Sequence, residues 1–240
     1  MEKAIIEIRA GAGGDEASLF ASDLFKMYSK YAQNQGWEVK VLDSNQRETG
    51  GYAQITMEIK GEKAYSNLKH EGGVHRVQRV PATEKSNRIH TSTASVAVLE
   101  KPKQEEIKIN TNDLKTDFFK SSGKGGQNVN KRQTAIRITH VPTGIVVSSQ
   151  AQRNLDQNRQ SALSILQAKL HQMEKDKLHS EISKERNAQI KTADRSEKIR
   201  TYNFPQDRIT DHRIKKSFHN IEKILEGKME KIIKKLTLDT

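Results

Sequence analysis

Residues 4–31 read AIIEIRAGAGGDEASLFASDLFKMYSKY, and this stretch decides the fold of the first half of the chain. Apolar residues dominate 4–9, which predicts a short strand that ends at the glycine cluster starting at Gly11. Asp15 is then the predicted cap of a helix. Apolar side chains recur along that helix every three or four residues, at Phe20, Leu24, Met27, Tyr28 and Tyr31. A strand, a glycine turn and an amphipathic helix predict an α+β unit.

Further strands are expected in the first hundred residues. Their predicted ranges are 37–42, 53–59, 74–80 and 93–99, and turn signals lie at Gly50-Gly51, Gly61 and Gly72-Gly73. Lys101-Pro102-Lys103 then marks the start of a second unit. Its predicted strands are 105–109, 134–139 and 145–149, and a helix of about 157–185 closes it, with Leu163, Leu166, Leu170 and Met173 on one stripe.

The rest of the chain is polar until its end. Residues 186–213 carry one proline and no strong periodicity, which predicts a connector or hinge rather than a core element. A final helix is expected near 217–236. Its apolar side is Ile221, Leu225, Met229, Ile232 and Leu236.

Charge is distributed unevenly along the chain. The formal net charge is +12, and residues 1–110 hold 16 Lys and Arg against 15 Asp and Glu, so nearly all of the excess lies in 111–240. A basic surface favours a polyanionic partner, because neutralising phosphates releases counterions. The same charge also suits a basic protein without such a partner.

Several classes of site and location are excluded or disfavoured by the composition. The chain has no cysteine, so it has no disulfide framework, thiolate metal site or cysteine nucleophile. Among the eight histidines, His70 and His75 come without an accompanying ligand set, and we expect neither a metal nor a cofactor. No apolar run approaches the roughly 18 residues that cross a bilayer. A cytoplasmic location without membrane contact is the expectation.

The sharpest motif is Ser121-Ser122-Gly123-Lys124-Gly125-Gly126-Gln127-Asn128-Val129-Asn130. Its glycines permit unusual backbone angles and leave no side chain to block a ligand. From glycine content alone, an ordinary flexible hairpin loop is the more frequent explanation. The basic residues around it, among them Lys120, Lys124, Lys131, Arg132 and Arg137, make nucleic acid the natural ligand.

This loop resembles the Gly-Gly-Gln loop of the class I bacterial peptide chain release factors, and the family pattern is complete from Ser122 to Asn130. The resemblance continues through His140-Val141-Pro142-Thr143-Gly144 and through Arg195 to Gln206. It implies that Gly125, Gly126 and Gln127 trigger hydrolysis of peptidyl-tRNA. A neutral amide is no general base, so Gln127 is expected to position water and to stabilise the oxyanion with its backbone N–H.

A second motif has the same implication. Pro81-Ala82-Thr83 lies between Gln78 and the pair His90-Thr91. In release factors of the type that reads UAA and UAG, a Pro-x-Thr tripeptide stands in this context. By resemblance, Thr83 contacts the first two bases, His90 stacks beneath the second, and Gln78 with Thr91 meets the third.

The early glycine loop also acquires a role by resemblance. Amides near Gly13, together with Glu16, are expected to contact the first uridine of the codon. A nucleotide phosphate site is disfavoured, because two carboxylates follow and the Gly-Lys-Ser/Thr signature is absent. Where the family has glycine before Arg88 this chain has Asn87, which tolerates a left-handed turn best after glycine.

The family resemblance also predicts the organisation. A codon-recognition domain, an α/β sandwich, is expected at 1–105 and is completed by the C-terminal segment 205–240. A smaller α+β catalytic domain with a long helix is expected at 106–187, and a hinge or switch connector at 188–204. The family's usual N-terminal helical domain lacks a counterpart before residue 4.

Partners implied by the resemblance are the ribosome with its RNA, the stop codon and the P-site peptidyl-tRNA. A glutamine methyltransferase acting at N5 of Gln127 is implied as well, as is a class II release GTPase whose contact is weakened without the N-terminal domain. The chain is expected to be a monomer and not an autonomous enzyme. A ribosome-rescue hydrolase and a catalytically silent RNA-binding module are the alternatives.

Overall fold

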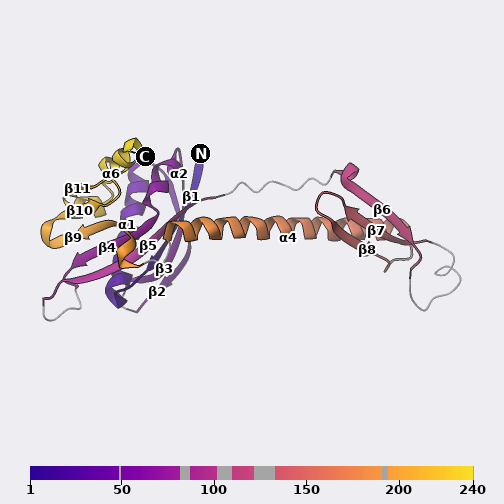
Figure 1. Ribbon diagram of the computed structural model, residues 1–240, viewed down its shortest axis with the longest axis horizontal. Coiled ribbons are helices and arrows are strands. Elements are labelled where there is room, and N and C mark those ends of the chain that lie inside the picture. Colours follow the sequence, from indigo (N-terminus) through magenta and orange to yellow (C-terminus); the bar gives the residue numbers. More distant parts are fainter. Residues whose placement is uncertain (49, 82–86, 102–109, 122–132, 191–193, 240) are drawn as a thin grey trace. The chain divides into compact units, whose positions relative to one another are not determined.

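The computed structural model describes residues 1–48, 50–81, 87–101, 110–121, 133–190 and 194–239. The chain forms two compact units, each with its own sheet and hydrophobic core (Figure 1). Unit 1 comprises Met1–Pro102 and Ile182–Thr240, and unit 2 comprises Lys103–Glu181. The predicted α+β class is confirmed.

Unit 1 is built on an eight-stranded sheet in the order β11-β10-β9-β4-β5-β1-β3-β2. Its strands are β1 (Glu2–Ala10), β2 (Glu38–Gln46), β3 (Tyr52–Gly61), β4 (Gly73–Arg79), β5 (His90–Glu100), β9 (Lys198–Asn203), β10 (Arg208–Asp211) and β11 (Lys216–His219). Neighbours are antiparallel apart from β4 and β9, which run parallel. The five strands predicted before residue 100 are confirmed, with ends that differ by a few residues.

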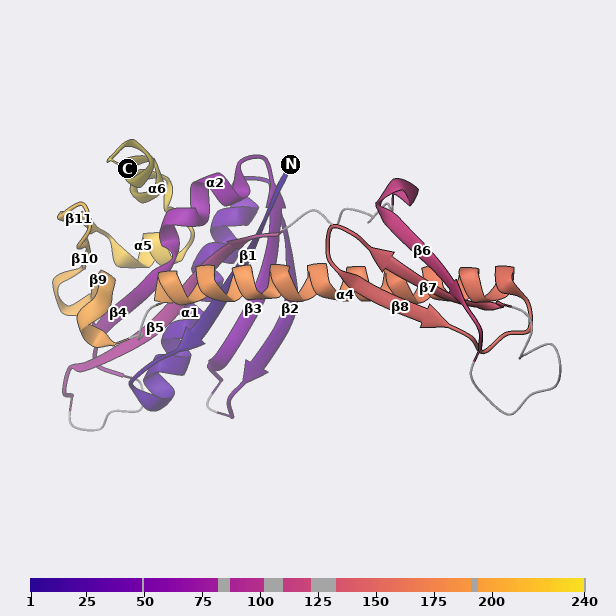
Figure 2. The same ribbon diagram turned by 45° about the vertical axis from the view of Figure 1, so that its right-hand side comes forward.

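One face of this sheet carries the core of unit 1. Helix α1 (Gly14–Asn34) packs against β1, β3 and β5 on that face (Figure 2). The alternation of β1 points Ala4, Ile6 and Ile8 into the cluster, where they are fully buried. The short helices α2 (Ala64–Leu68), α5 (Ile221–Leu225) and α6 (Glu230–Asp239) add further residues to the core.

Unit 2 is a three-stranded antiparallel sheet in the order β6-β7-β8, covered by a long helix. The elements are β6 (Leu114–Phe119), β7 (Ala135–His140), β8 (Ile145–Ser149) and α4 (Leu155–Ile190). Residues 182–190 of α4 belong to unit 1. Leu166 and Leu170 fill the core beneath α4, whereas Met173, expected on the same stripe, is 41% exposed. β6 was not predicted, and the strand expected at 105–109 lies outside the described residues.

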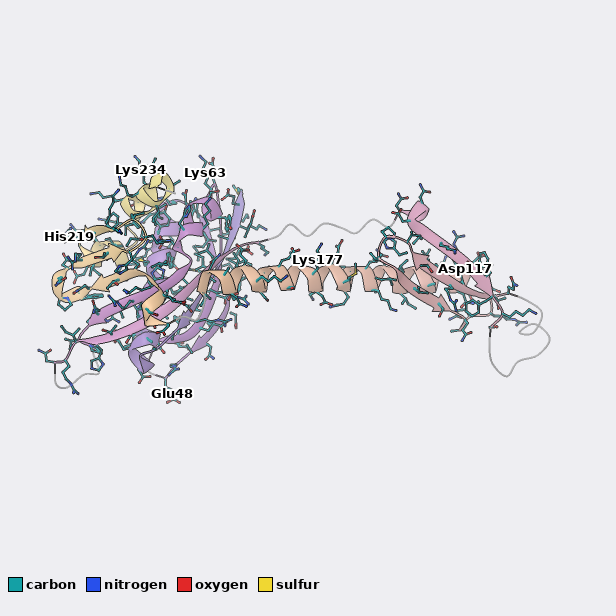
Figure 3. The ribbon with its side chains drawn as sticks, viewed as in Figure 1. Glu48, Lys63, Asp117, Lys177, His219 and Lys234 are labelled. Atoms are coloured by element: carbon teal, nitrogen blue, oxygen red, sulfur yellow. The ribbon has the colours of Figure 1, made fainter. Side chains whose placement is uncertain are left out.

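Short 3₁₀ turns lie at Lys69–Glu71 (η1), Thr111–Asp113 (η2), Arg195–Glu197 (η3) and Phe204–Gln206 (η4). Within the described residues, no helix is long and apolar enough to span a membrane. Charged side chains project into solvent from both units, for example Glu48, Lys63 and Lys234 in unit 1 and Asp117 in unit 2 (Figure 3).

Two predictions about helices are wrong. Asp15 does not cap α1, since the helix starts at Gly14 and its N-cap is Gly13, without a side-chain hydrogen bond. The single helix expected near 217–236 is instead β11, α5 and α6. Gly227 lies between these two helices. Its φ of +91° and the 2.6 Å that would separate a Cβ from the backbone nitrogen of Tyr31 both favour glycine at this break.

The expectation that 186–213 holds no core element is also wrong. This segment includes the last turn of α4 and the strands β9 and β10, and Tyr202 and Ile209 are fully buried in the core of unit 1. Residues 191–193 lie outside the described residues. The polar sequence of β9 hid the strand, because its largest buried side chain is the charged Arg200.

A buried ionic network fixes β9 and β10 to the rest of unit 1. Arg200 donates from Nη1 and Nη2 to the two carboxylate oxygens of Glu71, at 2.6 and 2.8 Å, and from Nη2 to Asp211 at 3.2 Å. Tyr28 of α1 donates to Glu71 at 3.0 Å. All four side chains are fully buried, so β9 is joined to η1 by an ion pair and, through Glu71, to Tyr28 of α1 by a hydrogen bond.

His75 of β4 completes this network as a neutral side chain. Its Nε2 lies 3.0 Å from the backbone oxygen of Glu71, which can only accept, so Nε2 carries the proton. Nδ1 then accepts from the Tyr202 hydroxyl at 3.3 Å. Burial, reinforced by the charge of Arg200, lowers the pKa of His75 to about 4.

Candidate nucleic-acid interface

The loop between β1 and α1 is held on the first residues of β5. Gly11 donates its N–H to the carbonyl of Thr93 at 2.8 Å, and Thr93 donates to the carbonyl of Ala12 at 3.0 Å. Gly13 has φ of +136°, and a Cβ there would lie 2.2 Å from the hydroxyl of Ser92. Only glycine therefore allows the loop to pass this close to β5 and to place the start of α1 beside it.

The start of α1 offers backbone donors rather than a free carboxylate. The first N–H groups of a helix have no acceptor within the helix. Glu16, predicted as a site residue, is 3% exposed, and its Oε1 accepts from Nε of Arg79 at 2.5 Å. Asp15 is half exposed and lies 3.8 Å from Arg47. The start of α1 therefore presents backbone amides next to the half-exposed Asp15.

The end of β4 and the start of β5 bring two predicted residues together. Gln78 lies directly opposite Thr91 in the antiparallel register, and Arg79 lies opposite His90. Opposed residues share a face of a sheet, and successive residues alternate between faces. Gln78 and Thr91 therefore lie on one face of this pair of strands, and His90 lies on the other.

The connection between β4 and β5 is only partly described. Pro81 is buried, and Asn87 has φ of +54°, as expected for its left-handed position. Ala82 and Thr83, the remaining predicted codon-reading residues, lie outside the described residues. The predicted residues Gly13, Glu16, Gln78, Pro81, His90 and Thr91 thus come from the loop before α1, from α1, from the adjoining ends of β4 and β5 and, for Pro81, from the connection between these strands.

The Gly-Gly-Gln motif falls in unit 2 and lies outside the described residues. This holds for Lys124, Gly125, Gly126, Gln127, Lys131 and Arg132. Its flanks are described, since β6 and β7 pair as far as Phe119 opposite Ala135. Lys120 and Arg137 are exposed, and the Arg137 guanidinium lies over the ring of Phe119 at 5.4 Å. Both are available to a phosphate backbone.

Asn158 of α4 anchors the chain just after the motif, and sequence reasoning missed it. It is fully buried and donates from Nδ2 to the carbonyls of Thr134 and Gln152, at 2.8 and 2.9 Å. Its Oδ1 accepts from the Ser149 hydroxyl and from the N–H of Gln152. An asparagine inside an amphipathic helix gives little signal by itself, because only the fold reveals that both of its ends are occupied.

A second missed residue is Arg79, whose contacts extend beyond Glu16. Its Nη1 donates to Asp23 of α1 at 2.7 Å, and its guanidinium lies 5.2 Å from the ring centre of Phe204. Burial alone would lower the pKa of Arg79, but attraction to Asp23 and Glu16 outweighs it and raises the pKa.

Across the ranges that the structure describes, no cluster of His, Asp or Glu is suited to hold a metal ion.

Comparison with known proteins identifies the family. The PCRF domain matches residues 1–96 and the RF-1 domain matches 102–213. Curated relatives named peptide chain release factor 1 include those of Thermotoga maritima, 54% identical over 98% of this chain and 69% of that protein, and of Aquifex aeolicus, 58% identical over 95% and 63%. The chain spans about two thirds of the length of these relatives.

A solved structure agrees with them. RF2 of Thermus thermophilus is 36% identical, and it superposes with a TM-score of 0.59 over 97% of this chain and 66% of that one. The matched domains together cover unit 2 and most of unit 1, and the named relatives share more than half of their aligned residues with this chain. The chain therefore belongs to the peptide chain release factor family, among the relatives named peptide chain release factor 1.

Proposed function

We propose that this chain recognises the stop codons UAA and UAG in the ribosomal A site and triggers hydrolysis of the peptidyl-tRNA ester. The observation that carries the proposal is the facing pair Gln78 and Thr91. The pair stands at the two ends of the segment that contains Pro81-Ala82-Thr83. Family membership supports the same conclusion.

The first codon position is assigned to the start of α1. A uracil O4 accepts hydrogen bonds, whereas the amine at the same place on cytosine donates them. Backbone N–H groups from Gly13 to Glu16 therefore favour uracil. The carboxylate of Glu16 is paired with Arg79, so its contribution to the codon contact comes from its amide.

The second and third positions are assigned to opposite faces of the β4–β5 pair. Thr83 contacts the first two bases, and its hydroxyl can both donate and accept. His90 stacks against the second base. Because Gln78 and Thr91 lie on the other face, the third base is separated from the first two and is read alone. Amide and hydroxyl groups accommodate either purine there.

The hydrolytic step is assigned to Gly125, Gly126 and Gln127. The glycines let the backbone approach the terminal adenosine of the tRNA. The N–H of Gln127 stabilises the developing oxyanion, and its side chain positions the attacking water. The ribosome supplies the remaining groups, so the protein is not an enzyme by itself. Lys120, Lys124, Lys131, Arg132 and Arg137 hold the RNA backbone nearby.

The partners follow from this role. The chain acts as a monomer in the cytoplasm on ribosomal RNA, mRNA and peptidyl-tRNA, and it needs no cofactor or metal. A methyltransferase modifies N5 of Gln127, and a class II release GTPase is a further partner. We assign the conformational change on codon recognition to the part of the predicted connector 188–204 that lies outside β9.

A release assay on three kinds of programmed ribosome tests the proposal. The A site presents a stop codon, a sense codon or no codon, and release of labelled peptide from P-site tRNA is measured with the 240-residue chain. We expect release only on the stop codon. Release on the empty A site alone indicates a ribosome-rescue hydrolase, and binding without release on any of the three indicates a silent RNA-binding module.

A further inference from the structure

Arg79 joins two elements that the proposed codon site requires. It is the last residue of β4, and its side chain is 20% exposed. Its Nε and Nη1 contact Glu16 and Asp23, which lie on α1 in the first turn and about two turns further along. One guanidinium thus fixes the end of a strand to two points on a helix.

The ion pair between Arg79 and Glu16 is buried. Glu16 is 3% exposed, and its second oxygen, Oε2, has no hydrogen-bond partner among the described residues. Removing the guanidinium leaves this buried carboxylate without its partner, which is destabilising. The contact of Arg79 with the ring of Phe204 adds η4, so the side chain links β4 to α1 and to η4.

Arg79 and Glu16 each stand close in sequence to a segment of the proposed codon site. Beyond Arg79 the chain leads through Val80 to Pro81-Ala82-Thr83, and before Glu16 it leads back to Gly13. We propose that Arg79 is a positioning residue that sets the spacing between the start of α1 and the end of β4, and through it the discrimination at the first codon position. This inference rests on the proposed function, and it assigns Arg79 no contact with RNA, because Glu16, Asp23 and Phe204 occupy its guanidinium.

Arginine suits this task better than lysine. Its planar guanidinium presents donors in a fixed arrangement that reaches two carboxylates at once, whereas an ammonium group is a single flexible point charge. Arg79→Lys therefore keeps the charge beside Glu16 and loses the fixed geometry. Arg76 offers a matched control, because it is on the same strand, faces the other side of the sheet and contacts Thr201 at 3.2 Å.

The experiment compares the wild-type chain, Arg79→Lys and Arg76→Lys in peptide release on ribosomes that carry UAA or CAA. We expect Arg79→Lys to lower the ratio of kcat/KM on UAA to that on CAA by about tenfold or more, the equivalent of one charge-assisted hydrogen bond. The change lies in KM, since the catalytic loop is untouched. Arg76→Lys keeps the wild-type ratio, and thermal melting confirms that the variants fold.

The outcomes separate this inference from the proposed function. A wild-type chain that releases on neither codon contradicts both. Release by the wild type together with an unchanged UAA to CAA ratio in Arg79→Lys overturns only the role of Arg79, even if both rates fall equally. If Arg79→Lys does not fold, Asp23→Asn removes one anchor at a carboxylate that is 26% exposed, and an unchanged ratio in that variant overturns the inference instead.

Discussion

Arg200 of β9 and Glu71 of η1 form a two-pronged ion pair, with nitrogen–oxygen distances of 2.6 and 2.8 Å, and neither side chain is exposed to solvent. The two residues are far apart in sequence. Attraction to Arg200 outweighs the effect of burial, which alone would raise the pKa of Glu71, and the pKa is lowered. The pair therefore keeps both charges inside unit 1 and ties the C-terminal strands to its first half.

Removing one partner of this pair should strongly destabilise unit 1. We expect Arg200→Met to lower the free energy of unfolding by about 3–5 kcal/mol, because it leaves Glu71 and Asp211 buried without that cation. Denaturant titration measures the change. Arg208→Met, at an exposed arginine on β10, is the control and should change stability by less than about 0.5 kcal/mol. Equal effects of the two substitutions would contradict the importance of the buried pair.

His75 should make stability depend on pH below neutrality. Its pKa is about 4 when folded and 6.5 in the reference state, so the unfolded chain binds a proton that the folded chain does not. The stabilisation is present above pH 6.5 and is lost as pH falls toward 4, by on the order of 3 kcal/mol at most.

The difference between wild type and His75→Gln isolates this contribution. His70 and His212, whose pKa values are also lowered, act in the same direction and remain in both proteins. We expect the variant to be less stable at pH 7 and to lose less of its stability between pH 6.5 and 4.5. Parallel pH curves for the two proteins would show that His75 is not the titrating group.

The apolar elements were the part of the fold that the sequence could predict. β1, α1 and β3 alternate or repeat as their burial requires, since their inward positions carry Ile, Leu, Met and aromatic side chains. β9 escaped prediction because Arg200 and Thr201 are buried polar residues, and their partners Glu71 and Arg76 lie more than a hundred positions away. Hydropathy cannot indicate a strand whose buried charge is satisfied at such a distance.

The residues of the candidate site were likewise only partly predictable from the sequence. Gln78, His90 and Thr91 were found through family motifs, and the structure adds the register that places the first and last of them together. Arg79 and Asn158 were missed, because each acts by joining two segments and neither belongs to a recognisable local pattern. Contacts of this kind become visible only when the fold is known.

The Gly-Gly-Gln loop should be separable from codon recognition by mutation. We expect Gly126→Ala to abolish peptide release and to leave stop-codon-dependent ribosome binding nearly intact, since the added Cβ would obstruct the approach to tRNA and the residues proposed to read the codon are in unit 1. Gln127→Ala should be milder if the backbone N–H carries much of the effect. Release by the Gly126 variant at the wild-type rate would remove the loop from the mechanism.

The ratio of release efficiencies on UAA, UAG and UGA tests the central claim most directly. We predict efficient release on UAA and UAG and poor release on UGA, because the hydroxyl of Thr83 suits adenine at the second position and a mismatched base leaves polar groups unpaired. Thr83→Val keeps the shape and removes the hydroxyl, so it should lower release on UAA and UAG while ribosome binding in the presence of codon remains measurable. Equal release on UGA, or indifference to Thr83→Val, would contradict the account.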